Sequence, residues 1–524
     1  MQTAVDEYYA INSDFPQGGK LNIPSLGGLF EIRWDPNASV TQWGGLAYFA
    51  SFLKISGVFD RLVADAPFEY NSNNSPGVRN VVGTMITAII TGKKRYDHIN
   101  HMRNDTAGAT LLGLERIVSD ESVRRALKKA DEEKLDEWLT NHEREVFTAL
   151  LQFPYIVDWD NSVKTIYGHQ EGAEIGYNPH KPGRPSHNYH TLFIGSVRMT
   201  LTVDVQSGKN HAGMCGMPRL WQLVDSLPKD RLPRLIRGDV GYGNETIMCE
   251  AEERSLTYLF KIKRSRNVCA LFKRLETSHE WKPCGDGWEA IDTMIRLDGW
   301  SKMRRCLLVR RPSKPEFVPA PRKRGRPKKN EPNLVQQEFE FVKDLKGRSW
   351  DTFALVTNDT TLDPLALTQL YRDRGDCENN FDEYKNQWGW SGFVTRKLKP
   401  TRAMARLIAI VANWWNVFCR LANGKKHLEA VTSRPALLGI IGRVVKSGRQ
   451  NVLRLTSTHV DAEEIKETLC KIGRFLARIS AIAPQLDFSE RWTLILRVAF
   501  WKFLGNGTGP PMSERLQLLL RSAT

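Results

Sequence analysis

The stretch that decides the fold is YIVDWD, residues 155–160, where the sequence changes from helical to strand-like patterning. The residues before it carry apolar side chains at helical spacing, as in TQWGGLAYFASFLKISGVFDRLV. After it, short β-type runs alternate with amphipathic segments that begin at helix-capping residues. Strands that alternate with helices predict an α/β fold, with a mixed sheet covered by helices.

Residues 155–264 are expected to form the order β, β, β, α, β, α, β. The expected strands are YIVDWD, HTLFIGSV, RMTLTVDV, PRLIRGDVGYG and TYLFKIKR, and the expected helices are AGMCGMPRLWQLVDSL and NETIMCEAEERSL. Asn244 is the predicted cap of the second helix, and Asp363 with Pro364 begins a later helix in the same way. Asp204 ends RMTLTVDV and is interpreted as a turn residue.

Composition divides the chain into five regions, two of which form one α/β core. They are a mostly helical region at 1–150, the first part of the core at 151–264, an insertion at 265–345, the second part of the core at 346–425 and a helical region at 426–524. The first region is the predicted DNA-binding domain. The insertion contains the basic, Pro-rich strip VRRPSKPEFVPAPRKRGRPKKNEP, which we expect to be extended.

The chain is strongly basic, because 75 Lys and Arg against 59 Asp and Glu give a formal net charge of +16. A large basic protein with an ordinary hydrophobic content of 41% is typical of proteins that bind a polyanion. Double-stranded DNA is therefore the expected partner. The alternative is an enzyme that is merely basic.

Cysteine usage and hydropathy bear on the cellular compartment. The eight Cys are scattered without a C-x-x-C pair, which argues against a zinc ribbon and a disulfide framework. The first residues have neither a basic start nor an apolar run, and the most apolar stretch contains Arg406 and Arg420. We expect a protein without membrane association that is cytoplasmic and associated with the nucleoid.

Three Asp residues end two of the expected strands. Asp158 and Asp160 end YIVDWD and point to the same face, because strand side chains alternate, and Asp239 follows the apolar part of PRLIRGDVGYG. A buried carboxylate costs free energy unless it is paired, hydrated or bound to a cation. Three explanations compete for each acid, which are a turn cap, an ion pair with Arg237 and a metal ligand.

Residues 371–385, YRDRGDCENNFDEYK, form a dense charge run of the kind that is typical of a solvated helix face. On a helical projection, Tyr371, Arg374, Glu378 and Lys385 fall within an arc of about 60°. The acids predicted to lie off this stripe as solvated bystanders are Asp373, Asp376 and Glu383, whereas Asp382 lies close to it. An acid between cations could bind a metal ion while the cations bind phosphate oxygens.

The pattern Y-x2-R-x3-E-x6-K, at Tyr371, Arg374, Glu378 and Lys385, resembles the signature of DDE transposases from bacterial insertion sequences. VDWDNS is similar to the first-Asp strand of that group, and IRGDVGYG is similar to its R-x-D-x-G-[FY] second-Asp strand. Other segments, such as YGHQEGAEIGYN, also resemble one branch of these enzymes. The similarity extends from about residue 80 to residue 420.

The resemblance implies a ribonuclease-H-like mixed sheet with flanking helices, interrupted by a mainly β insertion for which residues 265–345 have the right place. It also implies that Asp160, Asp239 and Glu378 are the catalytic acids and hold Mg²⁺, for which Mn²⁺ substitutes, in a two-metal mechanism. The Asp-x-Ser context favours Asp160 over Asp158 as the first ligand.

Further residues are expected to contact DNA. By the resemblance, Tyr371, Arg374 and Lys385 hold phosphates near the transposon end. Arg124 and Arg125 lie on a basic segment that suits either a helix-turn-helix reader or an ordinary exposed helix.

The insertion offers two more sets of candidates. RKRGRPKK contains Arg322, Arg324 and Arg326 and resembles an AT-hook, although a flexible basic strip with non-specific phosphate attraction is the slightly favoured interpretation. Trp281, Trp288 and Trp300 could stack a flipped base or could be core residues.

The function expected from these patterns is that of an insertion-sequence transposase. It would bind terminal inverted repeats as a homodimer on paired ends and catalyse Mg²⁺-dependent cleavage and strand transfer. The alternatives are a non-catalytic DNA-binding protein derived from a transposase and a structure-specific nuclease on the same fold.

Overall fold

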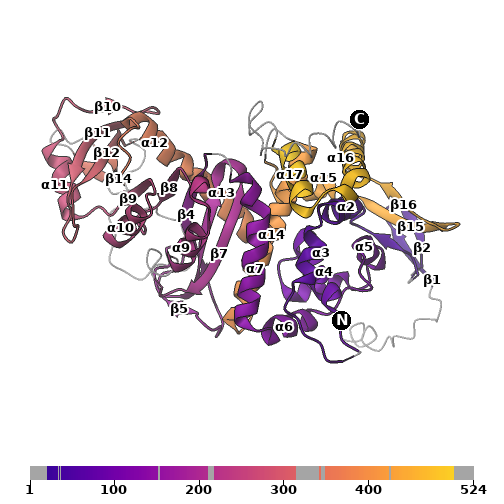
Figure 1. Ribbon diagram of the computed structural model, residues 1–524. Coiled ribbons are helices and arrows are strands. Elements are labelled where there is room, and N and C mark those ends of the chain that lie inside the picture. The colour runs from indigo at the N-terminus through magenta and orange to yellow at the C-terminus, as the bar shows by residue number, and fades with distance from the viewer. Residues whose placement is uncertain are drawn as a thin grey trace.

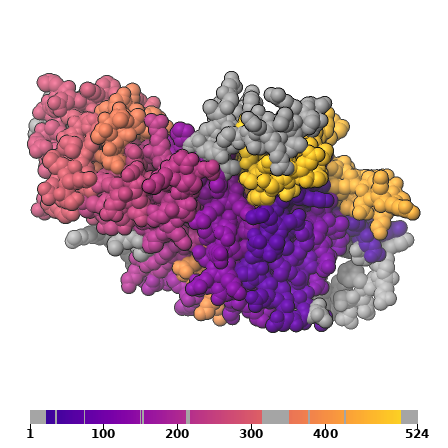
Figure 2. Space-filling view, viewed as in Figure 1, coloured from indigo at the N-terminus to yellow at the C-terminus, as the bar shows by residue number. Residues whose placement is uncertain are grey.

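The computed structural model describes residues 20–33, 35, 37–72, 74–151, 154–210, 217–313, 341–343, 349–423 and 427–500. The molecule is elongated, with the strands of the insertion at one end and the N- and C-terminal helices together at the other (Figure 1). The space-filling view shows the same two ends (Figure 2). Within the described residues, the helices are all too short or too polar to cross a membrane.

One large mixed sheet carries the candidate acids. Its strands lie in the order β10-β11-β12-β14-β9-β8-β4-β6-β5, with β7 paired to β6 and β13 paired to β14. Strand β8 is parallel to both β4 and β9, whereas β6 runs antiparallel to β4 and β7. The bounds of the core strands are β4 (Ile156–Thr165), β5 (Glu174–Ile175), β6 (Pro185–Ile194), β7 (Met199–Ser207), β8 (Leu235–Gly238) and β9 (Tyr258–Ile262).

The predicted order of strands and helices is present in this part of the chain. Helix α9 (Met217–Asp225) follows β7, and α10 (Glu245–Glu253) connects β8 to β9. Asn244 caps α10 as predicted, because its side chain accepts a hydrogen bond from the Ile247 amide. The mixed sheet and its helices are consistent with a ribonuclease-H-like α/β core.

The interpretation of Asp204 as a turn residue was wrong. Asp204 lies inside β7, opposite His190, and the strand continues to Ser207. Its carboxylate accepts a hydrogen bond of 2.6 Å from Gln206, two residues along on the same side of the strand. The acid is therefore paired within the sheet.

The insertion extends the core sheet edgewise. After α11 (Arg266–Arg274), its strands are β10 (Lys282–Pro283), β11 (Glu289–Ile295), β12 (Arg304–Pro312) and β13 (Phe341–Lys343), and they are followed by β14 (Ser349–Thr357). Strand β14 pairs with β12 on one side and with β9 on the other. Leu307 and Leu355 also share a buried cluster with Leu235 and Leu259 of the core. The position of the insertion is therefore fixed by backbone pairing as well as by packing.

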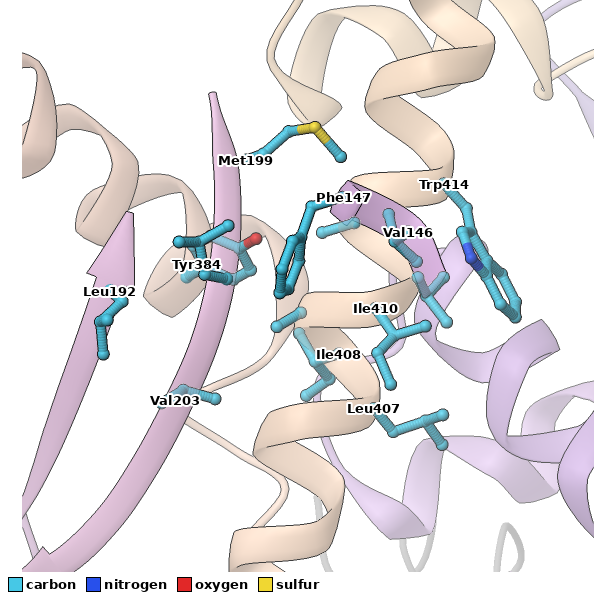
Figure 3. Close-up of a cluster of buried hydrophobic side chains, with 14 of the residues drawn as sticks. Val146, Phe147, Leu192, Met199, Val203, Tyr384, Leu407, Ile408, Ile410 and Trp414 are labelled. Atoms are coloured by element: carbon cyan, nitrogen blue, oxygen red, sulfur yellow. The ribbon is translucent and has the colours of Figure 1, made fainter. Parts of the chain in front are cut away.

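Two long helices cover the sheet on the side of β7. They are α7 (Glu132–Phe147) and α14 (Leu398–Ala422), which lie between the sheet and the N-terminal helices (Figure 1). Helix α14 is apolar on nearly all sides and buries most of its length, as expected of a central helix. Figure 3 shows Phe147 of α7, Met199 and Val203 of β7 and Ile408 of α14 in one buried cluster.

The N-terminal region is mostly helical, as predicted. Its helices are α2 (Leu46–Ser56), α3 (Val58–Ala64), α4 (Val78–Ile90), η1 (Tyr96–Met102), α5 (Thr106–Leu111) and α6 (Asp120–Lys129), and η2 (Thr148–Leu150) follows α7. Ser119 caps α6 by accepting from the Ser122 amide. The region also contains a hairpin of β1 (Lys20–Ser25) and β2 (Gly28–Arg33).

The C-terminal region is less helical than predicted. Besides α15 (Ala430–Leu437), α16 (Ala462–Ile482), η7 (Ala483–Gln485) and α17 (Phe488–Ala499), it contains strands β15 (Ile441–Ser447) and β16 (Gln450–Thr456). The two strands form a hairpin whose turn uses Gly448 at φ +61°. Alternating apolar residues around a Gly turn favour a hairpin over a helix.

The two terminal regions form one body. Strand β3 (Val40–Thr41) pairs with β15, so that the N-terminal part of the chain completes a C-terminal sheet. Phe52 of α2 packs against Phe418 of α14 and Trp492 of α17. The terminal helices therefore share a core with the helices that cover the large mixed sheet.

Candidate active site

The register of two parallel strands brings Asp160 and Asp239 together. In the pairing of β4 with β8, Trp159 lies opposite Gly238, so that the next residue on each chain is one of these acids. Both acids therefore lie at the carboxyl end of the parallel pairing, which is the side on which open α/β folds bind ligands. The side chain of Asp160 is 15% exposed and that of Asp239 is 44% exposed.

Asp160 has an unusual electrostatic environment. Burial raises the pKa of its carboxyl group, the Arg374 guanidinium lowers it in part, and the charge of Asp239 raises it again, so that it reaches about 6. The acid is therefore crowded by a like charge in a poorly solvated position. A cation placed between the two carboxylates would relieve this repulsion.

Two residues of the predicted signature contact the acids. Nη1 of Arg374 lies 2.6 Å from Oδ2 of Asp160, and its Nη2 lies 3.9 Å from Oδ2 of Asp239. The Tyr371 hydroxyl donates a hydrogen bond of 3.3 Å to Oδ1 of Asp239. The structure thus brings Tyr371, Arg374, Asp160 and Asp239 into one site.

The helix that carries the signature is not continuous. It consists of α12 (Pro364–Arg372), a 3₁₀ turn η5 (Asp373–Gly375), α13 (Asp376–Glu383) and a π turn η6 (Tyr384–Trp388). Asp363 caps α12 as predicted, by accepting from the Ala366 amide. The uniform projection used for the sequence is therefore approximate, because 3₁₀ and π turns change the angle per residue.

The remaining signature residues follow this break. Burial lowers the pKa of Lys385, while the negative charges of Asp382 and Asp160 oppose that shift, so Lys385 lies within electrostatic reach of Asp160. Glu378 lies on α13, but its side chain is outside the described part of the structure.

The alternative first ligand, Asp158, has a different partner. It is fully buried, and both of its carboxylate oxygens bind Arg237, with Nε at 2.6 Å and Nη2 at 2.7 Å. The ion pair considered from the sequence is therefore formed by Asp158. This geometry leaves Asp160 beside Asp239 as the candidate for the first ligand.

The prediction that Glu383 is a solvated bystander was wrong. Glu383 is 4% exposed and accepts hydrogen bonds from the Trp388 indole at 3.0 Å and the Ala430 amide at 3.1 Å. Its other oxygen is 2.8 Å from Nε2 of His427. Glu383 thus joins the signature helix to the segment before α15. Asp373 and Asp382 are exposed as expected.

Lys261 of β9 is a further candidate that sequence patterns missed. Its Nζ lies 3.9 Å from Oδ1 of Asp239, on the opposite side from β4. The signal was the single cation within YLFKI, the sequence of β9, whose other residues are buried. A lysine inside an apolar core strand is costly unless its charge faces a polar site.

Two other predicted DNA contacts, Arg124 and Arg125, lie on α6, which is distant from β4 and β8 (Figure 1). On α6, Arg124 pairs with Asp120 at 2.6 Å and with Glu121 at 3.1 Å, and the side chain of Arg125 is 63% exposed. Arg322, Arg324 and Arg326 fall outside the described residues.

Each of the three candidate Trp residues of the insertion lies against an arginine. The guanidinium carbon is 3.8 Å from the ring centre for Arg310 over Trp281, 4.5 Å for Arg311 over Trp288 and 5.4 Å for Arg304 over Trp300. Trp300 is buried, and the other two are half-buried. A cation over the ring face is a favourable contact in its own right.

The acids fit a divalent metal that prefers oxygen ligands. Asp160 and Asp239 supply carboxylate oxygens only, and their mutual repulsion favours a cation between them. Among the residues whose side chains the structure describes, no cluster of three or more His, Cys, Asp or Glu could hold a metal ion. Glu378, the predicted third acidic ligand, lies on α13.

The chain is similar to a family model and to solved structures. A family model described as "Transposase DDE domain group 1" matches residues 40–476. That range contains both acid-bearing strands, the broken signature helix and most of the terminal helices. The search of curated proteins found no match. Among solved structures, the cryo-EM structure of the piggyBac transposase synaptic complex with hairpin DNA is similar, with 12% identity, a TM-score of 0.35 and coverage of 90% of this chain and 87% of that chain.

Proposed function

Because the chain belongs to the Transposase DDE domain group 1 family, we propose that it is an active insertion-sequence transposase. It binds the terminal inverted repeats of its element and catalyses Mg²⁺-dependent DNA cleavage and strand transfer. The observation that carries this proposal is the pair of Asp160 and Asp239, which lie where the parallel pairing of β4 with β8 ends, with Arg374 in contact with both.

Asp160, Asp239 and Glu378 would hold the metal. Bound Mg²⁺ would activate the attacking oxygen and stabilise the leaving 3′ oxygen of the phosphodiester. The three acids supply negative charge and oxygen ligands, and the burial of Asp160 keeps competing water away from its carboxylate. Asp158 takes no part in ligation, because its oxygens are already bound to Arg237.

The cations around the acids would hold the phosphate. A scissile phosphate that approaches two carboxylates is repelled unless positive groups accompany it. Arg374 is planar and carries several donors, so it can exchange Asp160 for a non-bridging phosphate oxygen. Lys385 and Lys261 supply further positive charge, and Tyr371 supplies a hydroxyl donor on the Asp239 side.

DNA would be recognised over a larger surface than this site. The net charge of +16 favours association with a polyanion, and Arg124, Arg125 and the RKRGRPKK strip are candidate contacts. Each neutralised phosphate releases counterions, so end binding should weaken steeply with salt. Pairing of two transposon ends calls for a homodimer, and a DNA-directed protein of this kind would be nucleoid-associated in the cytoplasm.

The test is a cleavage and joining assay with labelled insertion-sequence end DNA, unlabelled target DNA and Mg²⁺ or Mn²⁺. Asp160→Ala, Asp239→Ala and Glu378→Ala should abolish both products and retain end binding. Asp382→Ala is the matched control, because Asp382 is exposed and lies on the same helix as Glu378. This variant should cleave DNA like the parent.

Three outcomes separate the alternatives. If all three variants cut like the parent, the assignment of the acids is wrong. If the parent binds end DNA but cuts under neither metal, the protein is a non-catalytic DNA-binding protein. Cleavage without joined product, with both substrates present, would indicate a nuclease.

A further inference from the structure

Arg237 connects three separate segments of the active-site region, its own strand and two others. It lies on β8, and its Nε and Nη2 donate to the two oxygens of Asp158 on β4 at 2.6 and 2.7 Å. Its remaining Nη1 donates to the carbonyl oxygen of Leu370, in the last turn of α12. Arg237 is 5% exposed and Asp158 is fully buried, so solvent does not compete for these bonds.

These contacts lie directly beneath the acids. Asp158 and Arg237 are opposite each other in the parallel pairing of β4 with β8. Each is two residues before a proposed metal ligand, which places the pair about 7 Å below Asp160 and Asp239 along the strands. The segments that carry Asp160, Asp239 and Tyr371 therefore meet at one guanidinium.

The contact with Leu370 positions the signature residues. Tyr371 follows Leu370 directly and donates to Asp239, and Arg374, one turn further on, pairs with Asp160. Arg374 itself lies in the 3₁₀ turn η5 between α12 and α13, so a regular helix does not fix its angle relative to Tyr371. A bond to the Leu370 carbonyl holds the helix end at the point from which this turn begins.

An arginine is chemically suited to this place. The last carbonyls of a helix lack intrahelical donors and carry partial negative charge, which a cation satisfies. The planar guanidinium offers one edge to a carboxylate and still has a donor for a third group. Lysine carries the same charge on a single nitrogen and cannot keep this fork geometry.

Stability alone does not account for the pair. A buried ion pair is often replaceable by apolar residues without loss, because desolvation offsets the attraction. Misplacement of reacting groups by about 1 Å, in contrast, can cost roughly a hundredfold in rate. The bonds of Arg237 join β4 and β8 to the signature helix, so they affect how far the reacting groups lie from one another.

We propose that Asp158 and Arg237 are positioning residues, which set the distance between the signature helix and the two strand acids. The proposal rests on the proposed transposase function for its effect on rate. The positioning itself is a property of the protein without metal or DNA. It is therefore testable by a measurement that does not depend on cleavage.

The test variant is Arg237→Lys, studied as full-length protein by hydrogen–deuterium exchange without metal or DNA. Amides of residues 364–383 should exchange about tenfold faster than in the parent. In the end-DNA assay, the cleavage rate at saturating DNA should fall about a hundredfold while end binding stays within twofold. Asp158→Asn, which keeps one oxygen acceptor, should show smaller changes of the same kind and serves if Arg237→Lys does not fold.

Arg406→Lys is the matched control. Arg406 is 3% exposed, binds both oxygens of Glu143 at 2.8 and 2.7 Å and donates to the Asp136 carbonyl at 3.2 Å. The Arg406→Lys variant therefore loses the same kinds of bonds, but at a place that contacts neither Asp160 nor Asp239. Its melting temperature should fall comparably, while exchange over residues 364–383 and cleavage per folded molecule should match the parent.

The proposal is overturned if Arg237→Lys leaves the exchange of residues 364–383 at the parental rate. It is also overturned if cleavage falls equally in Arg237→Lys and Arg406→Lys at the same melting temperature. If the parent itself does not cut, the transposase function fails, but the exchange comparison still decides whether Arg237 holds the helix.

Discussion

Oδ2 of Asp160 lies 2.6 Å from Nη1 of Arg374, across 214 residues of sequence. The guanidinium thus neutralises the acid that we propose as a metal ligand, and it comes from the helix that carries the proposed third ligand. Arg374 must give up this contact when a cation and a phosphate enter. The pair is therefore a contact of the resting site, and its loss should be measurable.

Arg374→Ala should bind Mg²⁺ more tightly than the parent while cutting DNA more slowly. Without the guanidinium, the metal no longer competes for Asp160, but the phosphate loses its partner. A tenfold tighter site adds about 1.4 kcal/mol of stabilisation by saturating metal. Differential scanning fluorimetry over a Mg²⁺ titration measures this shift.

Arg372→Ala is the control for that titration. Arg372 is next but one to Arg374 but donates to the Cys284 carbonyl instead of to the acids. Its Mg²⁺-induced shift should equal that of the parent. A shift in Arg374→Ala no larger than the parent's would contradict the competition.

Asp160→Asn should stabilise the metal-free protein at neutral pH. Burial and the charge of Asp239 raise the pKa of Asp160 to about 6 despite Arg374, whereas an unfolded Asp titrates near 4. Such a group contributes stability below pH 4 and loses it as the pH rises through 6, at a cost of about 2 to 3 kcal/mol. The Asn variant avoids this cost.

Urea unfolding in the presence of EDTA at pH 4 and pH 7.5 measures this effect. The free energy of unfolding of Asp160→Asn should exceed that of the parent at pH 7.5 and approach it at pH 4. Asp225→Asn is the control of opposite sign, because the hydrogen bond from Arg254 lowers the pKa of Asp225. Equal stability of Asp160→Asn and the parent at pH 7.5 would show that Asp160 is not strained by its neighbours.

Lys164 should make the protein more stable as the pH rises from 7 to 10. Burial, helped by the charge of Arg95, lowers the pKa of Lys164 to about 7, and its Nζ donates to the Trp390 carbonyl at 2.8 Å. Between pH 7 and 10 the unfolded chain holds one more proton, so deprotonation favours the folded state. Lys164→Met should remove this rise, which urea unfolding across that range would measure. If the free energy of unfolding of parent and variant changed in the same way with pH, this role of Lys164 would be contradicted.

Glu383→Gln should destabilise the protein at neutral pH by about 1 to 3 kcal/mol. Burial alone would raise the pKa of Glu383, but the bonds from His427, Trp388 and the Ala430 amide lower it below its ordinary value. The carboxylate therefore contributes stability above pH 4 that is lost as the pH falls further. The gap between parent and variant should narrow below pH 4, and a gap that widens there would contradict the assignment.

The order of strands and helices along residues 155–264 was predictable because the sequence signals for each element are local. Apolar runs with capping residues between them defined each element, and Asn244 and Asp363 cap the helices that they were expected to cap. Asp160 and Asp239 became candidates for the same reason, since each follows an apolar run in the sequence, although β4 continues past Asp160 to Thr165. The family resemblance then supplied the roles proposed for them.

The other features depend on contacts between distant parts of the chain. Glu383 is buried because His427 and Ala430, more than forty residues away, cover it. The breaks in the signature helix follow from tertiary packing, since a regular 3.6-residue period cannot predict 3₁₀ or π turns. Which of Asp158 and Asp160 pairs with Arg237 depended on strand register, which the sequence alone left open.

The pairing of β3 with β15 has a consequence for synthesis on the ribosome. Thr41 lies opposite Gly442, so the first region cannot complete this sheet until the second has been made. At about 5 to 20 residues per second, the interval is roughly 20 to 80 s. During that time the apolar faces of α2 that later meet α16 and α17 have no partner, and a nascent chain should need chaperone protection.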